Sequence, residues 1–479
     1  MSAPEGPLVV GVDSSTQSTK ALVVDAGTGH VVARGQAPHR LLPGPGQESD
    51  PESWWQALET ALGQCGHAAG EAAAVSVGGQ QHGLVTLDRA GRPVRPAMLW
   101  NDVRSAPQRD WMVEQLGGPE LCAERVGSVP APSFTATKWA WLHEHEPESA
   151  AATAAVRLPH DYLTGRLTGE GTTDRGDASG TGWWATSTQS YDEEILELLR
   201  LDSELLPRVL PPGEAAGRVG GGLPLPEGAL VAGGTGDNMA AALGLGLHPG
   251  QPVLSLGTSG TVYAVSTHRP ADPTGTLSGF ADARGDWLPL ACTLNCTLAV
   301  DRIAALLGLG REAVEGGGEV TLLPFLDGER TPHLPHSSGL LTGLRHATTG
   351  GQVLQAAYDG AVFALLRALK PVLENEPRQG SGDEAPLLLI GGGAKGTAWR
   401  DTVRRLSGRA VQVPRAEELV ALGAAAQAAG LLLGEDPAAV ARRWGTADGP
   451  AYEAVPRDDE ALDRVAGALR DADTLLRRQ

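Results

Sequence analysis

Positive charge is scarce in this sequence of 479 residues. Lysine occurs only at Lys20, Lys138, Lys370 and Lys395, and the excess of acidic residues gives a formal net charge of −19 at pH 7. A protein that binds DNA or RNA needs a basic surface for the phosphates, so this balance argues against nucleic acid as the main partner. It does not argue against a nucleotide, which needs only a local site.

Cysteine is also rare, and long apolar runs are missing. Cys65, Cys122, Cys292 and Cys296 show neither the spacing of a disulfide framework nor a second pair of metal ligands, so we interpret them as small buried residues. The sequence contains no run of about 18 apolar residues, which is the length that a membrane-spanning helix needs. The polar, proline-broken N-terminus does not resemble a signal peptide. We therefore expect a cytoplasmic protein without a membrane partner.

The sequence contains no GxxxxGK[ST] phosphate loop, and the nearest string, GGGAKGT, has the wrong spacing. Instead, a strand–turn–strand pattern occurs twice, as LVVGVD-SSTQSTK-ALVVD in residues 8–25 and as VLSL-GTSGT-VYAVS in residues 253–266. We call their turns the first and second cradles. Such a turn presents backbone N–H groups and short hydroxyls to one point, which suits phosphate oxygens. Two cradles indicate two related domains that hold one polyphosphate.

The length favours two or three domains. The clearest boundary signal is HPGQP at residues 248–252, directly before the second cradle. Apolar spacing predicts helices over residues 51–67, 352–373 and 418–433, and a strand, glycine turn and helix over 387–408. Helices that alternate with hairpins indicate mixed-sheet α/β domains. Residues from about 436 onward are charged and are expected to form a helical appendage.

The first cradle offers a carboxylate and several donors. Asp13 ends a buried strand and suits hydrated Mg²⁺, while Thr16, Ser18 and Lys20 can donate to phosphate oxygens. The alternative interpretation is a hydroxyl-rich hairpin turn without a ligand.

Asp237 in the string GGTGDN is the sharpest single candidate for chemistry. Glycines precede it and a predicted helix follows it. A carboxylate there could take a proton from an attacking hydroxyl as a general base. The alternative is that Asp237 is only the N-cap of that helix.

Two polar strings suit a polyol. Gln81 and His82 in QQHG follow a predicted buried strand, and Asn101 and Arg104 lie in WNDVR. Amides and imidazole match neighbouring hydroxyls as both donors and acceptors, although all four residues could also be ordinary loop residues. In the second half, GGGAK at 391–395 could let a flat ring or ribose lie against bare backbone.

Taken together, these strings resemble the FGGY carbohydrate kinases, and among them most closely the xylulokinases. The resemblance spans roughly residues 8 to 435 and rests on the strings GVDSSTQSTK, GGQQHG, LWNDVR, LPHDYLTGRLTGE, TTDRGDASGT, GGTGDN, LSLGTSGT, LPFLDGERTPH and GGGAKGTAWRD. It implies an α/β fold of two ribonuclease-H-like domains, as in the actin, Hsp70 and sugar kinase superfamily, with an active-site cleft between them. The implied ranges are 1–247 for the sugar-binding domain, 248–435 for the ATP-binding domain and 436–479 for the appendage.

The resemblance also implies an activity and roles for single residues. It implies phosphorylation of D-xylulose by ATP and Mg²⁺ in domains that close, and a possible homodimer. The implied roles are Asp237 as base, Asp13 at the magnesium site, Gln81, His82, Asp237 and Asn238 as sugar contacts, Thr16, Lys20, Gly257 and Thr258 as phosphate contacts, and Gly392, Gly393 and Thr397 as the adenosine loop. The sequence departs from the family where Ser15 replaces a glycine and where Gln81 replaces a frequent methionine.

Other functions stay open at this point. The substrate could be another ketose or a polyol, such as ribulose or glycerol, or the protein could be a regulator that binds sugar without catalysis. An NAD-dependent dehydrogenase is disfavoured, because no G-x-G-x-x-G lies in a strand–turn–helix unit with an acidic residue about 20 positions later.

Overall fold

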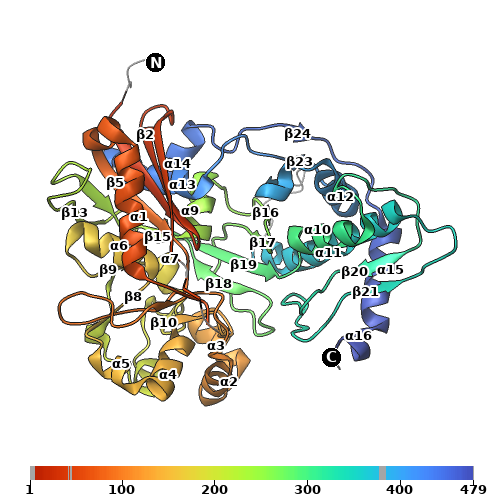
Figure 1. The fold of residues 1–479 in the computed structure, drawn as a ribbon, viewed down its shortest axis with the longest axis horizontal. Coiled ribbons are helices and arrows are strands. Elements are labelled where there is room, and N and C mark those ends of the chain that lie inside the picture. The colour runs from red at the N-terminus through yellow and green to blue at the C-terminus, as the bar shows by residue number, and fades with distance from the viewer. Residues whose placement is uncertain (1–5, 41, 44–45, 377–384, 478–479) are drawn as a thin grey trace. The chain divides into compact units, whose positions relative to one another are not determined.

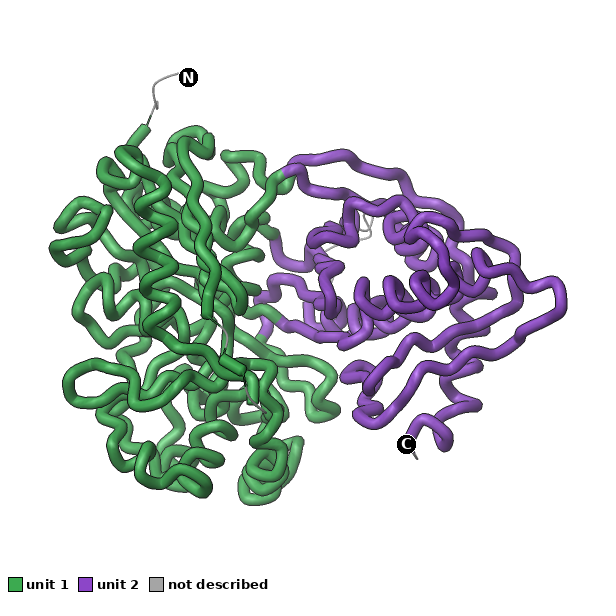
Figure 2. The backbone as a smooth tube through the Cα atoms, in the orientation of Figure 1, with its two compact units in different colours: residues 1–247, 269–288, 416–447 green, residues 248–268, 289–415, 448–479 purple. Residues whose placement is uncertain are grey.

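The computed structural model describes residues 6–40, 42–43, 46–376 and 385–477. The chain forms two compact units (Figure 2): unit 1 comprises residues 1–247, 269–288 and 416–447, and unit 2 comprises 248–268, 289–415 and 448–479. Two segments of the second half therefore belong to unit 1, which differs from the single range 248–435 expected from the sequence. The expected appendage, 436–479, is divided between the two units.

Unit 1 is built on a mixed sheet with the strand order β13-β14-β5-β1-β2-β3, and β15 pairs with β5 (Figure 1). Strands β1, β2 and β3 are antiparallel neighbours, whereas β5 runs parallel to β1 and β14 runs parallel to β5. The hairpin predicted over residues 8–25 is the β1–β2 pair. The strands are β1 (Leu8–Ser14), β2 (Ser18–Asp25), β3 (Val31–Pro38), β5 (Ala72–Gly79), β13 (Ala215–Arg218), β14 (Leu230–Ala232) and β15 (Thr235–Gly236).

Helices cover both faces of this sheet because its strands are apolar on both sides. Val10 and Val12 of β1 pack with α1 (Pro51–Gln64) and α6 (Pro159–Thr168), where Trp54 is fully buried. Val9 points to the opposite face and packs against α13 (Leu419–Leu433) and α14 (Pro437–Arg443). Alternate residues of one strand thus serve two separate cores.

Small residues let α13 approach the sheet and helix α9 (Asp237–Gly244) closely. A Cβ on Gly11 of β1 would lie 1.9 Å from the Ala421 carbonyl oxygen, and one on Gly423 would lie 1.8 Å from the Ala240 carbonyl oxygen. Glycine at these positions therefore allows a backbone contact that any side chain would prevent. This contact places the start of α13 beside the carboxyl end of β1.

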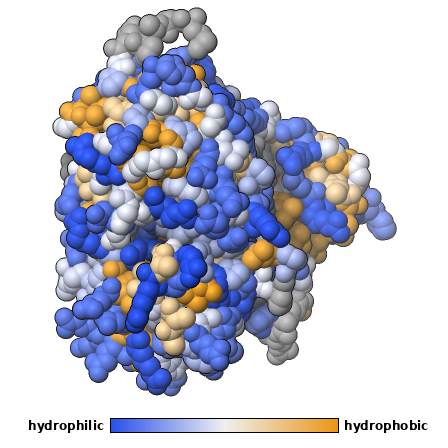
Figure 3. All heavy atoms as spheres, turned by 60° about the vertical axis from the view of Figure 1, so that its left-hand side comes forward, coloured by the Kyte–Doolittle hydropathy of each residue, from blue (hydrophilic) through white to orange (hydrophobic). Residues whose placement is uncertain are grey.

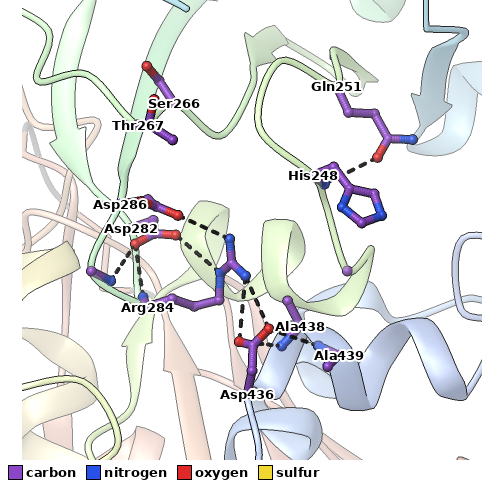
Figure 4. Close-up of polar contacts among 12 residues, drawn as sticks. His248, Gln251, Ser266, Thr267, Asp282, Arg284, Asp286, Asp436, Ala438 and Ala439 are labelled. Atoms are coloured by element: carbon purple, nitrogen blue, oxygen red, sulfur yellow. Dashed lines mark hydrogen bonds and ion pairs between the residues drawn. The ribbon is translucent and has the colours of Figure 1, made fainter. Parts of the chain in front are cut away.

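Segment 269–288 is tied to segment 416–447 inside unit 1 by Arg284 (Figure 4). Its guanidinium nitrogens lie 3.5 Å from Asp282, 3.3 Å from Asp286 and 3.3 Å from Asp436. Asp436 also caps α14 by accepting from the backbone N–H groups of Ala438 and Ala439. One arginine therefore links two chain segments that are about 150 residues apart in the sequence.

The rest of unit 1 forms a helical region with its own core, which includes the buried Trp139, Trp183 and Trp184. Its helices are α2 (Ala106–Gln115), α3 (Pro119–Val126), α4 (Thr135–His145), α5 (Pro147–Ala152), α7 (Arg175–Ala178) and α8 (Glu193–Leu198). Short strand pairs join these helices: β4 (Glu48–Ser49) with β7 (Ala97–Met98), β6 (Val85–Leu87) with β8 (Ala155–Arg157), β9 (Thr172–Asp174) with β12 (Arg208–Leu210), and β10 (Trp184–Ala185) with β11 (Ser190–Tyr191).

Unit 2 repeats the same arrangement of strands in the order β19-β17-β16-β22-β23-β24. Strands β16, β17 and β19 are antiparallel neighbours, β22 is parallel to β16, β23 is parallel to β22, and β24 is antiparallel to β23. The strands are β16 (Val253–Leu256), β17 (Gly260–Tyr263), β19 (Trp287–Thr293), β22 (Leu387–Ile390), β23 (Val411–Gln412) and β24 (Ala451–Tyr452). The strand before β19 in the chain, β18 (Ser278–Ala281), lies in segment 269–288 of unit 1.

The end of the chain takes part in the core of unit 2 and is not a separate appendage. Val465 and Leu469 of α15 (Asp459–Asp471) are buried with Phe325 and Ala364. The other helices of unit 2 are α10 (Thr297–Leu307), α11 (Gly350–Glu374), α12 (Thr397–Ser407) and α16 (Asp473–Leu476), and its short strand pair is β20 (Thr321–Leu323) with β21 (Leu340–Thr342).

On the face of unit 1 in Figure 3, apolar side chains are interspersed among hydrophilic ones. Cys65, Cys122 and Cys296 are buried, and Cys292 is half-buried. Within the described ranges, no single helix is both long and apolar enough to cross a membrane.

Candidate active site

The register of the sheet in unit 1 brings three predicted segments to one edge. Asp13 of β1 pairs with Gly78 of β5, and Gly78 pairs with Thr235 of β15. All three strands run in the same direction, so the loops that follow them start side by side. The first cradle, the QQHG string and Asp237 therefore meet at the carboxyl ends of these strands, where open α/β sheets commonly bind ligands.

Asp13 is a buried carboxylate with few charged neighbours. The Ser15 hydroxyl donates to its Oδ1 at 2.6 Å, and the Lys20 ammonium lies 3.9 Å from its Oδ2. Burial raises the pKa of Asp13 to about 6, against the lowering effect of Ser15 and Lys20. Ser15, which replaces the family's glycine, thus fits its position and bonds to the carboxylate that it follows.

Glu418 is a member of this cluster that the sequence analysis missed. Its Oε2 lies 2.5 Å from Lys20 Nζ, and its charge adds to the rise in the pKa of Asp13. Glu418 directly precedes α13 and has a φ of 58°, in the left-handed region that non-glycine residues rarely adopt. The one sequence signal was its place at the start of the predicted helix 418–433.

Asp237 is the first residue of α9, and Gly236 is the N-cap. The interpretation of Asp237 as a helix cap is therefore wrong. Its Oδ1 accepts from the Asn238 backbone N–H at 2.8 Å and from the Asn238 amide at 2.9 Å. Burial raises the pKa of Asp237 to about 7, and the charges of Asp13 and Asp177 add to the rise. A carboxylate with this pKa exchanges protons readily near neutral pH.

The QQHG string joins this group through one hydrogen bond, because the Asn238 amide also donates to Gln81 Oε1 at 2.9 Å. His82 has a φ of 65°, and its Nδ1 lies 2.8 Å from the Gly180 carbonyl oxygen. A carbonyl can only accept, so Nδ1 carries a proton. The ring stacks on Phe134, with centroids 5.0 Å apart.

The residues of the WNDVR string, predicted to bind the sugar, make several contacts inside unit 1. Arg104 lies 2.6 Å from Asp102 and 3.0 Å from Glu48, so local carboxylates neutralise its charge. Trp100 Nε1 donates to Thr16 Oγ1 at 3.0 Å and ties this loop to the first cradle. The side-chain oxygen of Asn101 is buried and finds no hydrogen-bond partner among the described residues. Ser18, also in the first cradle, accepts from the Gln36 amide at 3.3 Å.

Unit 2 brings its own predicted residues together. Gly257 and Thr258 form the turn between β16 and β17, and the Gly257 carbonyl accepts from Thr297 Oγ1 at 2.7 Å. A Cβ on Gly393 would lie 2.8 Å from Thr297 Cγ2, so Thr297 contacts both predicted loops. Gly392 beside it is open to solvent, and Thr397 begins α12. The sequence analysis did not identify Thr297.

The side chains of unit 1 suit a Mg²⁺ ion that is bound mainly by waters and substrate phosphates. No group of three or more His, Cys, Asp or Glu residues within the described part of the chain could hold a metal ion. Magnesium typically keeps several waters and binds one or two carboxylates together with substrate phosphates. The single buried carboxylate of Asp13 fits that mode of binding.

Comparisons with known proteins agree with this arrangement. Residues 8–244 match the N-terminal domain, and residues 253–431 the C-terminal domain, of the FGGY family of carbohydrate kinases. Xylulose kinases of Streptomyces rubiginosus and Streptomyces coelicolor are 74% and 73% identical to this chain, over 100% of this chain and 99% of each relative. The crystal structure of xylulose kinase from Bifidobacterium adolescentis, at 37% identity, covers 97% of this chain and 99% of its own with a TM-score of 0.85. The chain therefore belongs to the FGGY family of carbohydrate kinases.

Proposed function

We propose that this protein transfers the γ-phosphoryl group of ATP to the primary hydroxyl of D-xylulose, which gives D-xylulose 5-phosphate. The observation that carries the proposal is Asp237, held by Asn238 at the carboxyl ends of the strands, with a pKa near 7. The high identity to two xylulose kinases supports the choice of sugar.

In the proposed reaction, Asp237 accepts the proton of the sugar hydroxyl. The hydroxyl oxygen forms a bond to the γ-phosphorus, and the bond between the γ-phosphorus and the oxygen that leaves with ADP breaks. Gln81, His82 and Asn238 hold the sugar. The N–H groups and hydroxyls of the first cradle and of Gly257 and Thr258 donate to phosphate oxygens, and Gly392, Gly393 and Thr397 hold the adenosine.

Asp13 is the residue that would hold Mg²⁺, and Mg²⁺ bound there would neutralise charge on the phosphates. Lys20 forms ion pairs with both Asp13 and Glu418, so its contact with the phosphates depends on the charge of Asp13.

The test is a coupled assay of ADP release with D-xylulose, D-ribulose, L-ribulose, glycerol and gluconate. We expect the highest kcat/KM with D-xylulose, and a loss of at least ~10²-fold in kcat for Asp237→Asn, the usual scale for a general base. Asp192→Asn, which affects a helix cap and an ion pair with Arg125 outside the proposed site, is the control.

A higher kcat/KM with another compound would replace D-xylulose as the substrate. No ADP release with any of them would favour a regulator that binds sugar. Near-normal turnover of Asp237→Asn would remove Asp237 from the role of base while leaving the family membership intact.

A further inference from the structure

A cluster of four ionisable side chains lies beneath the site in unit 1, and the proposed reaction does not use it. His160 and Asp161 come from the LPHDYL string, and Asp174 and Asp177 from the TTDRGDASG string. His160 Nδ1 lies 2.8 Å from Asp177, and its Nε2 lies 3.3 Å from Asp161 and 3.7 Å from Asp174. His160, Asp161 and Asp177 are all 0% exposed.

Such a cluster stabilises a core less than apolar side chains of similar volume, because charged groups lose their hydration when they are buried. Burial lowers the pKa of His160, but the three carboxylates outweigh it and raise the pKa to about 9. The three carboxylates therefore favour the protonated form of the imidazole. Stability alone gives no reason to place an imidazole and three carboxyls here.

The histidine of this cluster lies directly against both substrate loops. A Cβ on Gly79, which precedes the QQHG string, would lie 2.9 Å from His160 Cβ. A Cβ on Gly234, which precedes Asp237 by three residues, would lie 2.6 Å from His160 Cδ2. His160 thus packs against the bases of both loops, with its backbone and Cβ at Gly79 and with its ring at Gly234.

The carboxylates make further contacts with the same loops. Thr235, two residues before Asp237, donates its hydroxyl to Asp174 Oδ2 at 2.7 Å. Asp174 also caps α7 by accepting from the Gly176 and Asp177 backbone N–H groups. The turn after α7 ends at Gly180, whose carbonyl accepts from His82 Nδ1. The cluster is therefore connected to the loop of Asp237, to the loop of Gln81 and to the ring of His82.

We propose that His160, Asp174 and Asp177 are positioning residues for phosphoryl transfer: they support the loop of Asp237 and the loop of Gln81 and His82, which the pairing of β5 with β15 brings side by side. This inference rests on the proposed function. The residues do not touch the substrate; they act through Gly79, Gly234 and Gly180.

The charges of the cluster also act on Asp237. The charges of Asp13 on β1 and Asp177 on α7 favour the protonated form of Asp237, and Lys20 lies 3.9 Å from Asp13 and 2.5 Å from Glu418. Removing the charge of Asp177 therefore makes Asp237 easier to ionise. This effect provides a readout that a purely structural role of the cluster would not produce.

The test compares Asp177→Asn with the wild type in the full-length enzyme, by the pH profile of kcat/KM with D-xylulose and by KM for sugar and for ATP. We expect the acid limb of the profile to move to lower pH. We also expect kcat/KM to fall by ~10-fold, the scale for residues that orient ligand-contacting groups, with KM for sugar rising more than KM for ATP. Asp192→Asn is again the control and should leave both the profile and the KM values unchanged.

A second pair of variants covers the case in which Asp177→Asn does not fold. Thr235→Val removes the hydrogen bond to Asp174 with little change of shape, whereas Thr235→Ser keeps it. We expect Thr235→Val to lower kcat/KM by ~10-fold and Thr235→Ser to restore most of it.

A wild-type pH profile and wild-type KM values in Asp177→Asn, with only a lower Tm, would overturn the proposal, as would full activity of Thr235→Val. Failure of the wild-type enzyme to phosphorylate D-xylulose would instead reject the proposed function, so the two failures are distinguishable.

Discussion

The sheets of the two units have the same strand order but differ in the chemistry of their first hairpins. Counted from the turn, Asp13 and Lys20 of unit 1 form the same cross-strand pair that Ser255 and Thr261 form in unit 2. In unit 1 that pair is charged and has Glu418 beside it. In unit 2 it consists of two hydroxyl side chains.

This difference shows that strand topology and site chemistry are set separately. Both hairpins present a turn of backbone N–H groups, which follows from the fold. Only the hairpin in unit 1 adds a buried carboxylate, so we propose metal binding by unit 1 and contacts by backbone and hydroxyl groups of unit 2. The loops after β5 and β22 differ in the same way: polar Gln80–Gly83 follow β5, and glycines 391–393 follow β22.

The largest expected effect tests the charge difference directly. Asp13→Asn should lower kcat/KM by at least ~10²-fold at saturating Mg²⁺, because an electrostatic group at the phosphates is removed. Ser255→Ala, at the matching position of unit 2, should cost less than ~10-fold. Steady-state kinetics with D-xylulose measures both, and equal losses would abolish the distinction between the hairpins.

The next prediction concerns the helix packed on each sheet. Val253 in unit 2 matches Gly11 in unit 1, where the backbone of α13 leaves no room for a Cβ. Gly11→Ala should destabilise the protein by ~1–3 kcal/mol through overpacking, as measured by chemical denaturation.

Gly63→Ala is the matched control, since nothing lies within 4 Å of the added Cβ and alanine favours the helix. Gly63→Ala should be neutral or stabilising. A neutral Gly11→Ala would mean that α13 does not need this close approach.

A smaller effect should separate the loop after β5 from the loop after β22. His82→Ala should raise KM for D-xylulose by ~10-fold with little change for ATP, since one hydroxyl contact and one oriented ring are lost. Thr397→Ala in unit 2 should raise KM for ATP by a few-fold instead. A rise in KM for ATP in His82→Ala would move His82 away from the sugar.

The smallest effect concerns stability and pH. Burial raises the pKa of Asp237 to about 7, so the folded protein holds this proton more tightly than the unfolded chain, where the pKa is about 4. The resulting stability is fully present below about pH 4 and is lost as pH rises through about 7. An asparagine at this position cannot ionise, so the Asp237→Asn variant should not lose this stability as pH rises. The Tm of the variant minus the Tm of the wild type should therefore be larger at pH 8 than at pH 5.

A Tm difference that is identical at the two pH values would contradict the raised pKa of Asp237. The comparison needs no catalytic readout, so it tests the electrostatics of the site independently of the reaction.

The sequence was sufficient for features that depend on neighbouring residues. The hairpin over residues 8–25 and the helices over 51–67 and 418–433 follow from apolar spacing and turn residues. The structure confirms them, with helix bounds of Pro51–Gln64 and Leu419–Leu433. Asp237 was identified because glycines and a helix start surround it in the chain. The two related halves were visible because the strand–turn–strand pattern repeats.

Contacts between segments that are distant in the sequence were decided only by the tertiary structure. Lys20 and Glu418 are 398 residues apart, and no local pattern pairs them. The same holds for Thr297 beside Gly257, and for His160 between Gly79 and Gly234. An electrostatic or packing interaction depends on distance in space, and only the folded sheet brings the ends of its strands together. The sequence by itself therefore determined which groups are available, and the fold decided which of them act on one another.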